Sequence, residues 1–73
     1  MDKITFKVLS DGSQHWSKNG KLHREDGPAV ILSDGTQLWF KNGEYHRKNG
    51  PAIIWSSGSQ FWYKEGEYFN IYN

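Results

Sequence analysis

Two His-Arg pairs carry the side chains of this sequence that are best suited to chemistry. They are His23-Arg24 and His46-Arg47, and they lie 23 residues apart. A histidine can act as a general base or as a metal ligand, and the planar fork of an arginine suits carboxylate and phosphate groups. The pairs therefore suggest three possible functions: catalysis, metal binding and anion binding.

Catalysis and metal binding lack the other residues that they need. The chain contains 3 His and 0 Cys, so a thiolate metal site and a disulfide framework are both excluded. No third ligand stands at metal spacing, no glycine-rich loop leads into a helix, and no Ser-His-Asp set stands apart from the repeated background. We therefore predict a protein that is not an enzyme and that has no cofactor and no metal site.

The His-Arg pairs belong to a repeat that covers almost the whole chain. Residues 32–43 restate residues 9–20 with a period of 23, and Trp16, Trp39 and Trp62 follow the same period. Such a period is typical of stacked supersecondary units with degenerate end copies. We predict a single domain, 1–73, with repeat 1 at about 8–30, repeat 2 at about 31–53 and a degenerate capping repeat 3 at about 54–73.

Turn-forming dipeptides divide the chain into short segments. Asp-Gly, Asn-Gly and similar pairs fall seven or eight residues apart, and the segments between them are rich in β-branched and aromatic residues. Such pairs supply the positive φ angles of two-residue hairpin turns. We predict an all-β protein, an antiparallel β-meander of about eight short strands in 23-residue hairpin repeats, forming a single twisted sheet or a half-open barrel.

Two-residue loops at Asp34-Gly35 and Asn42-Gly43 would fix the strand register, whereas the Gly27-Pro28 and Gly50-Pro51 steps are predicted as joints between repeats. Val30 then pairs with Trp39, and Phe40 pairs with Tyr45. Because side chains alternate between the faces of a sheet, the tryptophans share a face with Val30 and Ile53. The opposite face then carries these apolar residues: Ile4, Phe6, Val8, Ile31, Leu38, Ile54 and Phe61.

The same register places each repeated histidine opposite a tryptophan. Trp39 faces His46, and in the third copy the equivalent partner of Trp62 is Phe69. Since a phenylalanine replaces the histidine there, we favour a ring that stacks in the sheet over a ligand-binding or catalytic role.

Arg24 and Arg47 are predicted on the face opposite the tryptophans. A guanidinium there can stack on a ring or bind an acidic partner. The alternative is an ion pair with a nearby carboxylate such as Glu25 or Asp26, which contributes only about 0–1 kcal/mol when exposed.

Aromatic character increases along the chain on that second face. The series begins with His15, Ser17 and Leu22 in the first copy, whereas the Gln and Trp positions stay constant. Positions that stay the same in every copy indicate a structural role, and positions that differ between copies indicate adaptation to a partner. The alternative is that a terminal cap simply needs bulky residues. The predicted binding residues are Phe40, Tyr45, Arg47, Phe61, Tyr63 and Tyr68, with Arg24 and His15 added for a small ligand.

Charge and hydropathy narrow the class of partner. The formal net charge is +1, from 9 basic and 8 acidic residues, which gives no footprint for nucleic acid or for an anionic membrane. No apolar run is long enough to span a bilayer, and no signal peptide is seen. We expect a cytoplasmic protein. At this length a single core contributes only a few kcal/mol, so aromatic packing, repeat stacking or a homo-oligomer must add stability.

The repeat unit resembles a known family. Trp16-x-x-x-Gly20-x-x-His23 resembles the MORN (membrane occupation and recognition nexus) repeat. The string Asn-Gly-x-x-His-Arg-x-x-Gly-Pro-Ala looks like repeats in small proteins of tailed bacteriophages and giant viruses. The resemblance runs from about Val8 to Phe69 and implies a hairpin array. It also implies a phage accessory protein that binds and inhibits or redirects a host protein, including an antiviral-defence protein, in the host cytoplasm.

Two alternatives to a host-protein partner stay open. One is an oligomeric binder, or sponge, for a phosphorylated signal molecule, held by Arg24, Arg47 and His15 between protomers. The other is a structural module of a phage assembly.

Overall fold

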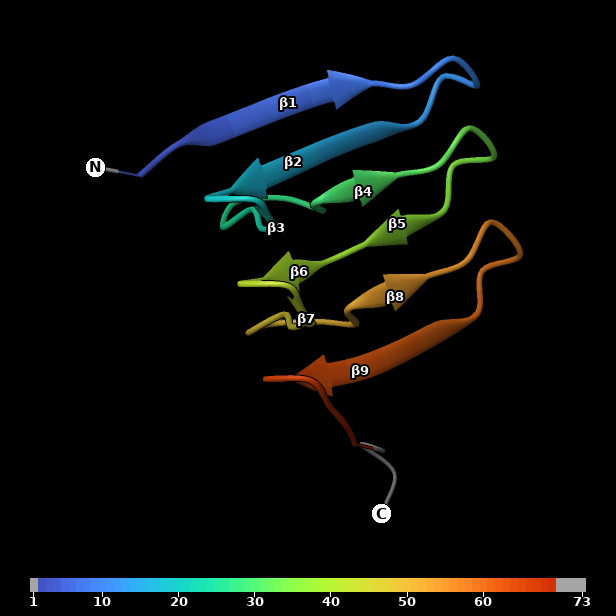
Figure 1. Cartoon of the computed structure of the whole chain (residues 1–73). Coiled ribbons are helices and arrows are strands. Elements are labelled where there is room, and N and C mark those ends of the chain that lie inside the picture. Colours follow the sequence, from blue (N-terminus) through green and yellow to red (C-terminus); the bar gives the residue numbers. More distant parts are fainter. Residues whose placement is uncertain (1, 70–73) are drawn as a thin grey trace.

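The computed structural model describes residues 2–69, and in this range the chain forms β-strands and no helix. The prediction of an all-β antiparallel meander is confirmed. The strands, shown in Figure 1, are β1 (Ile4–Val8), β2 (Gln14–Lys18), β3 (Lys21–Leu22), β4 (Val30–Ile31), β5 (Gln37–Leu38), β6 (Phe40–Lys41), β7 (Glu44–Tyr45), β8 (Ile53–Ile54), β9 (Gln60–Lys64) and β10 (Glu67–Phe69).

Eight of these strands form one open sheet. Its order is β1-β2-β4-β5-β8-β9-β10, β3 also pairs with β2, and β6 and β7 form a separate hairpin. Figure 1 shows the long strands following one another across the sheet, with β1 at one edge and β9 near the other. The molecule measures 38 × 30 × 16 Å. Because stacked sheets lie about 10 Å apart before their outer side chains are added, these dimensions fit a single layer that does not close into a barrel.

The turns at Asn19-Gly20, Asn42-Gly43 and Glu65-Gly66 are two-residue hairpins, as predicted. The residue before the glycine has a positive φ, 53° at Asn19, 51° at Asn42 and 51° at Glu65, and the glycine that follows is positive too. Two successive positive φ angles define the type I′ turn, whose twist matches that of the strands. Phe40 therefore pairs with Tyr45 across the second of these turns, which confirms that part of the predicted register.

The turns at Asp11-Gly12 and Asp34-Gly35 are one residue longer than predicted. The Leu32 N–H donates to the Thr36 carbonyl, and the Gly35 N–H donates to the Leu32 carbonyl, both at 2.9 Å. Only Gly35 has a positive φ, 92°, so the loop is a type I turn followed by a left-handed residue. The Asp34 carboxylate accepts the Thr36 N–H at 2.9 Å, and this bond holds the longer turn in place.

The extra loop residue reverses the predicted face of β4, and an equivalent loop at Ser57-Gly58, where the Trp55 N–H donates to the Ser59 carbonyl at 2.9 Å, reverses that of β8. Val30 pairs with Leu38 rather than with Trp39, and Leu38 in turn pairs with Ile53. A shift of one residue moves every side chain of a strand to the other face. Val30 and Ile53 therefore lie on the face of Leu38 and Phe61, not with the tryptophans.

The first strand was also assigned to the wrong face. Phe6 pairs with Trp16, and their ring centroids are 4.6 Å apart. Because side chains alternate along a strand, Ile4 and Val8 share the face of Trp16.

The buried core is small, and the copies are joined by hydrogen bonds. Among the described residues the buried apolar side chains are Ala29, Val30, Ala52 and Ile53. The Thr36 side chain is 0% exposed, and its hydroxyl accepts the Ser56 N–H of the next loop at 3.1 Å. Unpaired buried polar groups cost about 1–3 kcal/mol each, so such bonds fix the spacing between the copies.

The carboxylates of the Asp-Gly loops make stability depend on pH. The pKa of Asp11 is lowered by its hydrogen bond from the Ser13 backbone, and that of Asp34 by its bond from the Thr36 backbone. A pKa that is lowered in the folded state gives stability above the unfolded value of about 3.9, and that stability is lost as pH falls through the folded value.

We predict that the double substitution Asp11→Asn and Asp34→Asn makes stability less dependent on pH in acid. Asparagine keeps a side-chain oxygen acceptor but does not titrate. Urea unfolding followed by tryptophan fluorescence from about pH 5 to about pH 2 should show a shallower loss than in the unchanged protein. Equal losses in the two proteins would contradict this role.

Candidate functional site

The arginine of each His-Arg pair lies on a tryptophan ring. The Cζ atom of Arg24 is 3.9 Å from the ring centroid of Trp16, and that of Arg47 is 3.9 Å from the centroid of Trp39. Each Nη1 also donates to the carbonyl of the following proline at 3.2 Å. Ring stacking was anticipated, but the prediction that the arginines lie on the face away from the tryptophans was wrong.

The glycine of each Gly-Pro step leaves space for this guanidinium. A Cβ atom on Gly27 would lie 2.8 Å from the Cζ of Arg24, and one on Gly50 would lie 2.8 Å from the Cζ of Arg47. Both distances are shorter than real Cβ contacts. The guanidinium is therefore held between a ring on one side and bare backbone on the other, which explains the spacing in His-Arg-x-x-Gly-Pro.

The repeated histidines join one copy to the next. The Nδ1 atom of His23 accepts the Asn42 N–H at 2.9 Å, and that of His46 accepts the Glu65 N–H at 3.0 Å. Each bond connects a histidine to a hairpin turn 19 residues later. The histidines thus support the fold through a backbone hydrogen bond, whereas the sequence suggested ring stacking. Phe69, at the equivalent position, has no atom that can accept such a bond.

We predict that His23→Phe lowers the free energy of unfolding by about 1–3 kcal/mol, because it leaves the Asn42 N–H without its partner. His46→Phe should cost less, since its hydrogen bond is exposed whereas that of His23 is partly buried. Urea titration of the two variants measures both values. An unchanged midpoint for His23→Phe would show that this bond does not hold the copies together.

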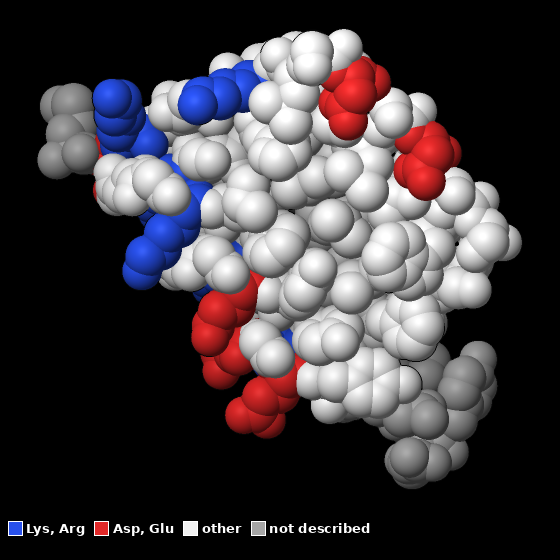
Figure 2. Space-filling model, turned by 45° about the vertical axis from the view of Figure 1, so that its right-hand side comes forward, with Lys and Arg blue, Asp and Glu red and all other residues white. Residues whose placement is uncertain are grey.

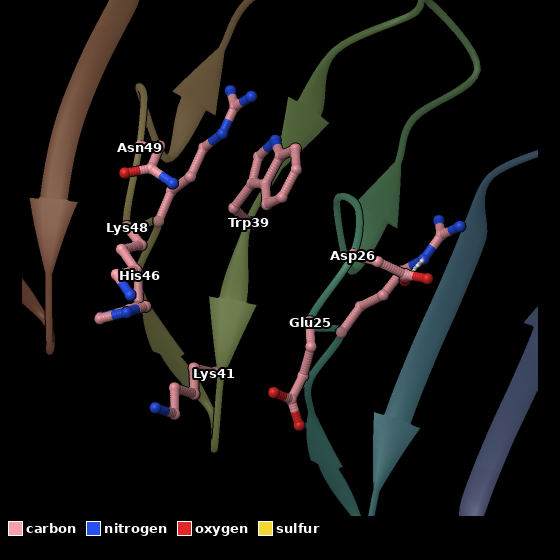
Figure 3. A pocket seen from close by; sticks show the side chains of 9 residues that line it. Glu25, Asp26, Trp39, Lys41, His46, Lys48 and Asn49 are labelled. Carbon is pink, nitrogen blue, oxygen red and sulfur yellow. Dashed lines mark ion pairs between the residues drawn. The ribbon is translucent and has the colours of Figure 1, made fainter.

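A groove of about 360 Å³ lies between the His-Arg links of the first two copies. We call it the Arg47 groove. Figure 3 shows Glu25 and Asp26 on one wall, Lys48 and Asn49 on the other, and Trp39 between them. The lining residues are Arg24, Glu25, Asp26, Trp39, Lys41, His46, Arg47, Lys48 and Asn49.

An equivalent groove one copy earlier contains its own counter-ions. It holds about 520 Å³ and is lined by Trp16 and Arg24. Here the Nε atom of Arg24 lies 3.5 Å from Oδ1 of Asp26, and the Nζ atom of Lys18 lies 3.4 Å from Oδ2 of Asp2. Arg24 corresponds to Arg47 and Lys18 corresponds to Lys41 at the period of 23. In the first groove both cations thus have a carboxylate nearby.

The second copy replaces both acids of the first link, Asp26, which pairs with Arg24, and Glu25, which lies 3.4 Å from Nε2 of His23. Asn49 stands where the first copy has Asp26, and Lys48 stands where it has Glu25. Within residues 2–69, no carboxylate lies within the 4.0 Å ion-pair distance of Arg47. The same backbone therefore presents an internally paired arginine in one copy and an arginine without an acidic partner in the next.

Trp39, which lines this groove, has an indole N–H that is closed to solvent. It is buried and has no acceptor within the described part of the chain. A buried donor without a partner costs about 1–3 kcal/mol. Because it is inaccessible to solvent, this N–H is not a donor for a ligand in the Arg47 groove.

The five aromatic residues that the sequence predicted for binding lie in one continuous row. We call it the aromatic row. Its ring centroids are separated by 4.4 Å (Phe40 and Tyr45), 5.1 Å (Tyr45 and Tyr63), 5.5 Å (Tyr63 and Tyr68) and 6.3 Å (Phe61 and Tyr68). Phe61 is 37% exposed and Tyr68 is 53% exposed, so the row is open to solvent at its C-terminal end.

The other three predicted binding residues lie outside this row. Arg24 and Arg47 stack on Trp16 and Trp39, which are not part of the row. His15 pairs with Lys7 and Val30 in the sheet and lines neither arginine groove. The predicted set therefore divides into one aromatic surface, two arginine sites and a separate histidine.

The charged groups are unevenly distributed over the surface. Figure 2 shows a face on which most of the area is free of Lys, Arg, Asp and Glu, with charged groups gathered near its rim. The sheet also contains a row of paired residues, one from each strand, in which no side chain is charged. Its residues are Val8, Gln14, Ile31, Gln37, Ile54 and Gln60. Such a surface suits contact with protein better than contact with a phosphate backbone.

The sequence matches no protein-family model, and no curated protein or solved structure matches it. The resemblance to MORN repeats and to viral proteins therefore stays a prediction. In residues 2–69 no three His, Cys, Asp or Glu side chains are grouped to hold a metal ion. The described chain also has no helix of the length and hydropathy needed to cross a membrane.

Proposed function

We propose that this protein is a non-catalytic protein-binding module and that the aromatic row is its contact surface. In this role it is a small accessory protein that inhibits or redirects a host protein by covering part of its surface. The observation that carries the proposal is the unbroken contact of five rings from four strands, β6, β7, β9 and β10.

The composition of the row supports a protein partner. Phenylalanine and tyrosine bury a large apolar area with few rotatable bonds, and tyrosine keeps a hydroxyl for a hydrogen bond at the wet rim of an interface. Half-buried Phe40 and Tyr45 hold one end of the row against the fold, whereas Phe61 and Tyr68 are free to enter a pocket on a partner. The row is thus both anchored and accessible.

The thinness of the sheet supports the same conclusion. Four small or medium apolar side chains make up the buried core among the described residues, and the molecule is only 16 Å thick. A single layer cannot bury both of its apolar faces by itself. The exposed part of the aromatic row gains stability from burial against another protein.

We predict that Phe61→Ala with Tyr68→Ala weakens binding of the partner at least about tenfold, as expected when exposed aromatic anchors are removed. The partner is first identified by affinity capture from bacterial lysate and mass spectrometry, and its affinity is then measured by calorimetry. Trp55→Ala is the control, because Trp55 is 42% exposed but lies outside the row. Unchanged affinity in the double variant would remove the row as the contact surface.

A second candidate function follows from the Arg47 groove. The groove would bind a small anion, such as the phosphate of a signal molecule, through the fork of Arg47 and the ammonium groups of Lys41 and Lys48. The observation in favour is the exchange of Asp26 for Asn49 between equivalent positions, which leaves Arg47 without the acid that Arg24 has.

We predict that Asn49→Asp abolishes binding of such an anion, because the new carboxylate takes the place that Asp26 has beside Arg24. The mirror variant Asp26→Asn should leave Arg24 free and add a second site. Calorimetric titration with inorganic phosphate and with a nucleoside monophosphate measures both effects. The groove is not an anion site if the unchanged protein gives no heat of binding with either anion, or if the Asn49→Asp variant binds the anion as tightly as the unchanged protein.

A further inference from the structure

The outer edge of β1 is the longest apolar strand edge that neither candidate site uses. β1 pairs only with β2. Its side chains Ile4, Phe6 and Val8 are 65%, 51% and 62% exposed. A long, apolar and unpaired edge is a template for another strand, and proteins usually shorten it, cover it or place charges on it.

The hydrogen bonds on the inner side show which backbone groups face outward. The Asn19 N–H donates to the Lys3 carbonyl at 2.8 Å, and the Leu9 N–H donates to the Ser13 carbonyl at 2.8 Å. In an antiparallel pair both groups of a residue point to the same side, and the side alternates along the strand. The residues that direct their N–H and C=O to the free edge are therefore Ile4, Phe6 and Val8.

We propose that a second copy of this chain pairs with the free edge of β1, antiparallel and about a two-fold axis at Phe6. Phe6 then lies opposite its own counterpart, and Ile4 lies opposite Val8 of the other copy. Three pairs of outward-facing residues exchange two hydrogen bonds each. The two open sheets join into one.

Lys7 of β1 and Lys3, which directly precedes the strand, select this register. A register centred on Thr5 places Lys3 directly opposite Lys7, and one centred on Lys7 places two copies of that lysine opposite each other. Like charges that face each other across strands are destabilising. The register centred on Phe6 instead places Lys7 opposite Thr5, so it alone among these three avoids a pair of facing lysines.

Side-chain packing favours the same register. Ile4, Phe6 and Val8 lie on one face of β1, and in this pairing they meet the same three residues of the other copy. Cross-strand pairs of aromatic and β-branched residues contribute more than pairs of alanines. The ring of Phe6 is already fixed by Trp16, at 4.6 Å between centroids, so it needs little further ordering. A second copy supplies this complement by symmetry alone.

Single cysteines test the register, because the chain has 0 Cys of its own. Facing hydrogen-bonded residues have Cα atoms about 5.5 Å apart, within the range that a disulfide spans, whereas diagonal neighbours are about 7–8 Å apart. Under mild oxidation Phe6→Cys should form covalent dimers several times faster than Thr5→Cys, Lys7→Cys or the loop control Ser57→Cys. Faster crosslinking of Thr5→Cys or Lys7→Cys, or equal rates in all four, overturns the proposal.

Sedimentation equilibrium tests the edge without changing Phe6. Val8→Pro removes an N–H that faces outward and leaves the inward bonds to β2, which makes it a substitution that an edge strand tolerates. The unchanged protein should sediment as a dimer, and Val8→Pro should weaken the dimer at least tenfold while its circular dichroism spectrum stays the same. A monomeric unchanged protein, or equal dimerisation of a folded Val8→Pro variant, overturns the proposal.

Discussion

The fold depends on a guanidinium held between a tryptophan ring and a glycine. Arg24 on Trp16 and Arg47 on Trp39 have the same geometry, 3.9 Å from ring centroid to Cζ. The stack requires a glycine where a Cβ would collide, and the carbonyl after it receives the guanidinium N–H. It therefore connects the strand of one copy to the link that leads into the next. Since the apolar core is small, this repeated contact fixes the positions of strands and links that a larger domain would fix by packing in its interior.

The parts of the fold that follow from local residue chemistry could be predicted from the sequence. The Asn-Gly hairpins and the pairing of Phe40 with Tyr45 follow from the φ angles that these residues prefer. The length of the Asp-Gly loops could not be predicted in this way, because the dipeptide also suits a type I turn followed by a left-handed glycine. There the bond from the Thr36 N–H to the Asp34 carboxylate determines the outcome. One additional residue in each loop of this kind was enough to reverse the face of the strand before it.

The candidate sites were predictable to different degrees. The aromatic row could be found, because its residues diverge between copies whereas the scaffold positions repeat. The Arg47 groove could not be assembled, since the stack on Trp39 depends on the path of the link between copies rather than on strand alternation. A signal was nevertheless present in the printed sequence: Glu25 and Asp26 become Lys48 and Asn49 at a period of 23. A change of charge at one repeated position, beside an arginine that does not change, marks the site where two similar copies differ in what they bind.

The two ends of the described array differ in what they offer to a neighbour. Each histidine accepts a hydrogen bond from the hairpin of the following copy, and Phe69 at the third equivalent position lacks an acceptor atom. A fourth copy could therefore not be attached by the same bond, even if one were added. At the opposite end, the outward N–H and C=O groups of β1 can pair with any strand of suitable sequence. The third copy therefore lacks the side-chain acceptor by which each earlier copy holds the next hairpin, whereas an association through β1 stops at two copies, because a two-fold axis uses the β1 edges of both copies at once.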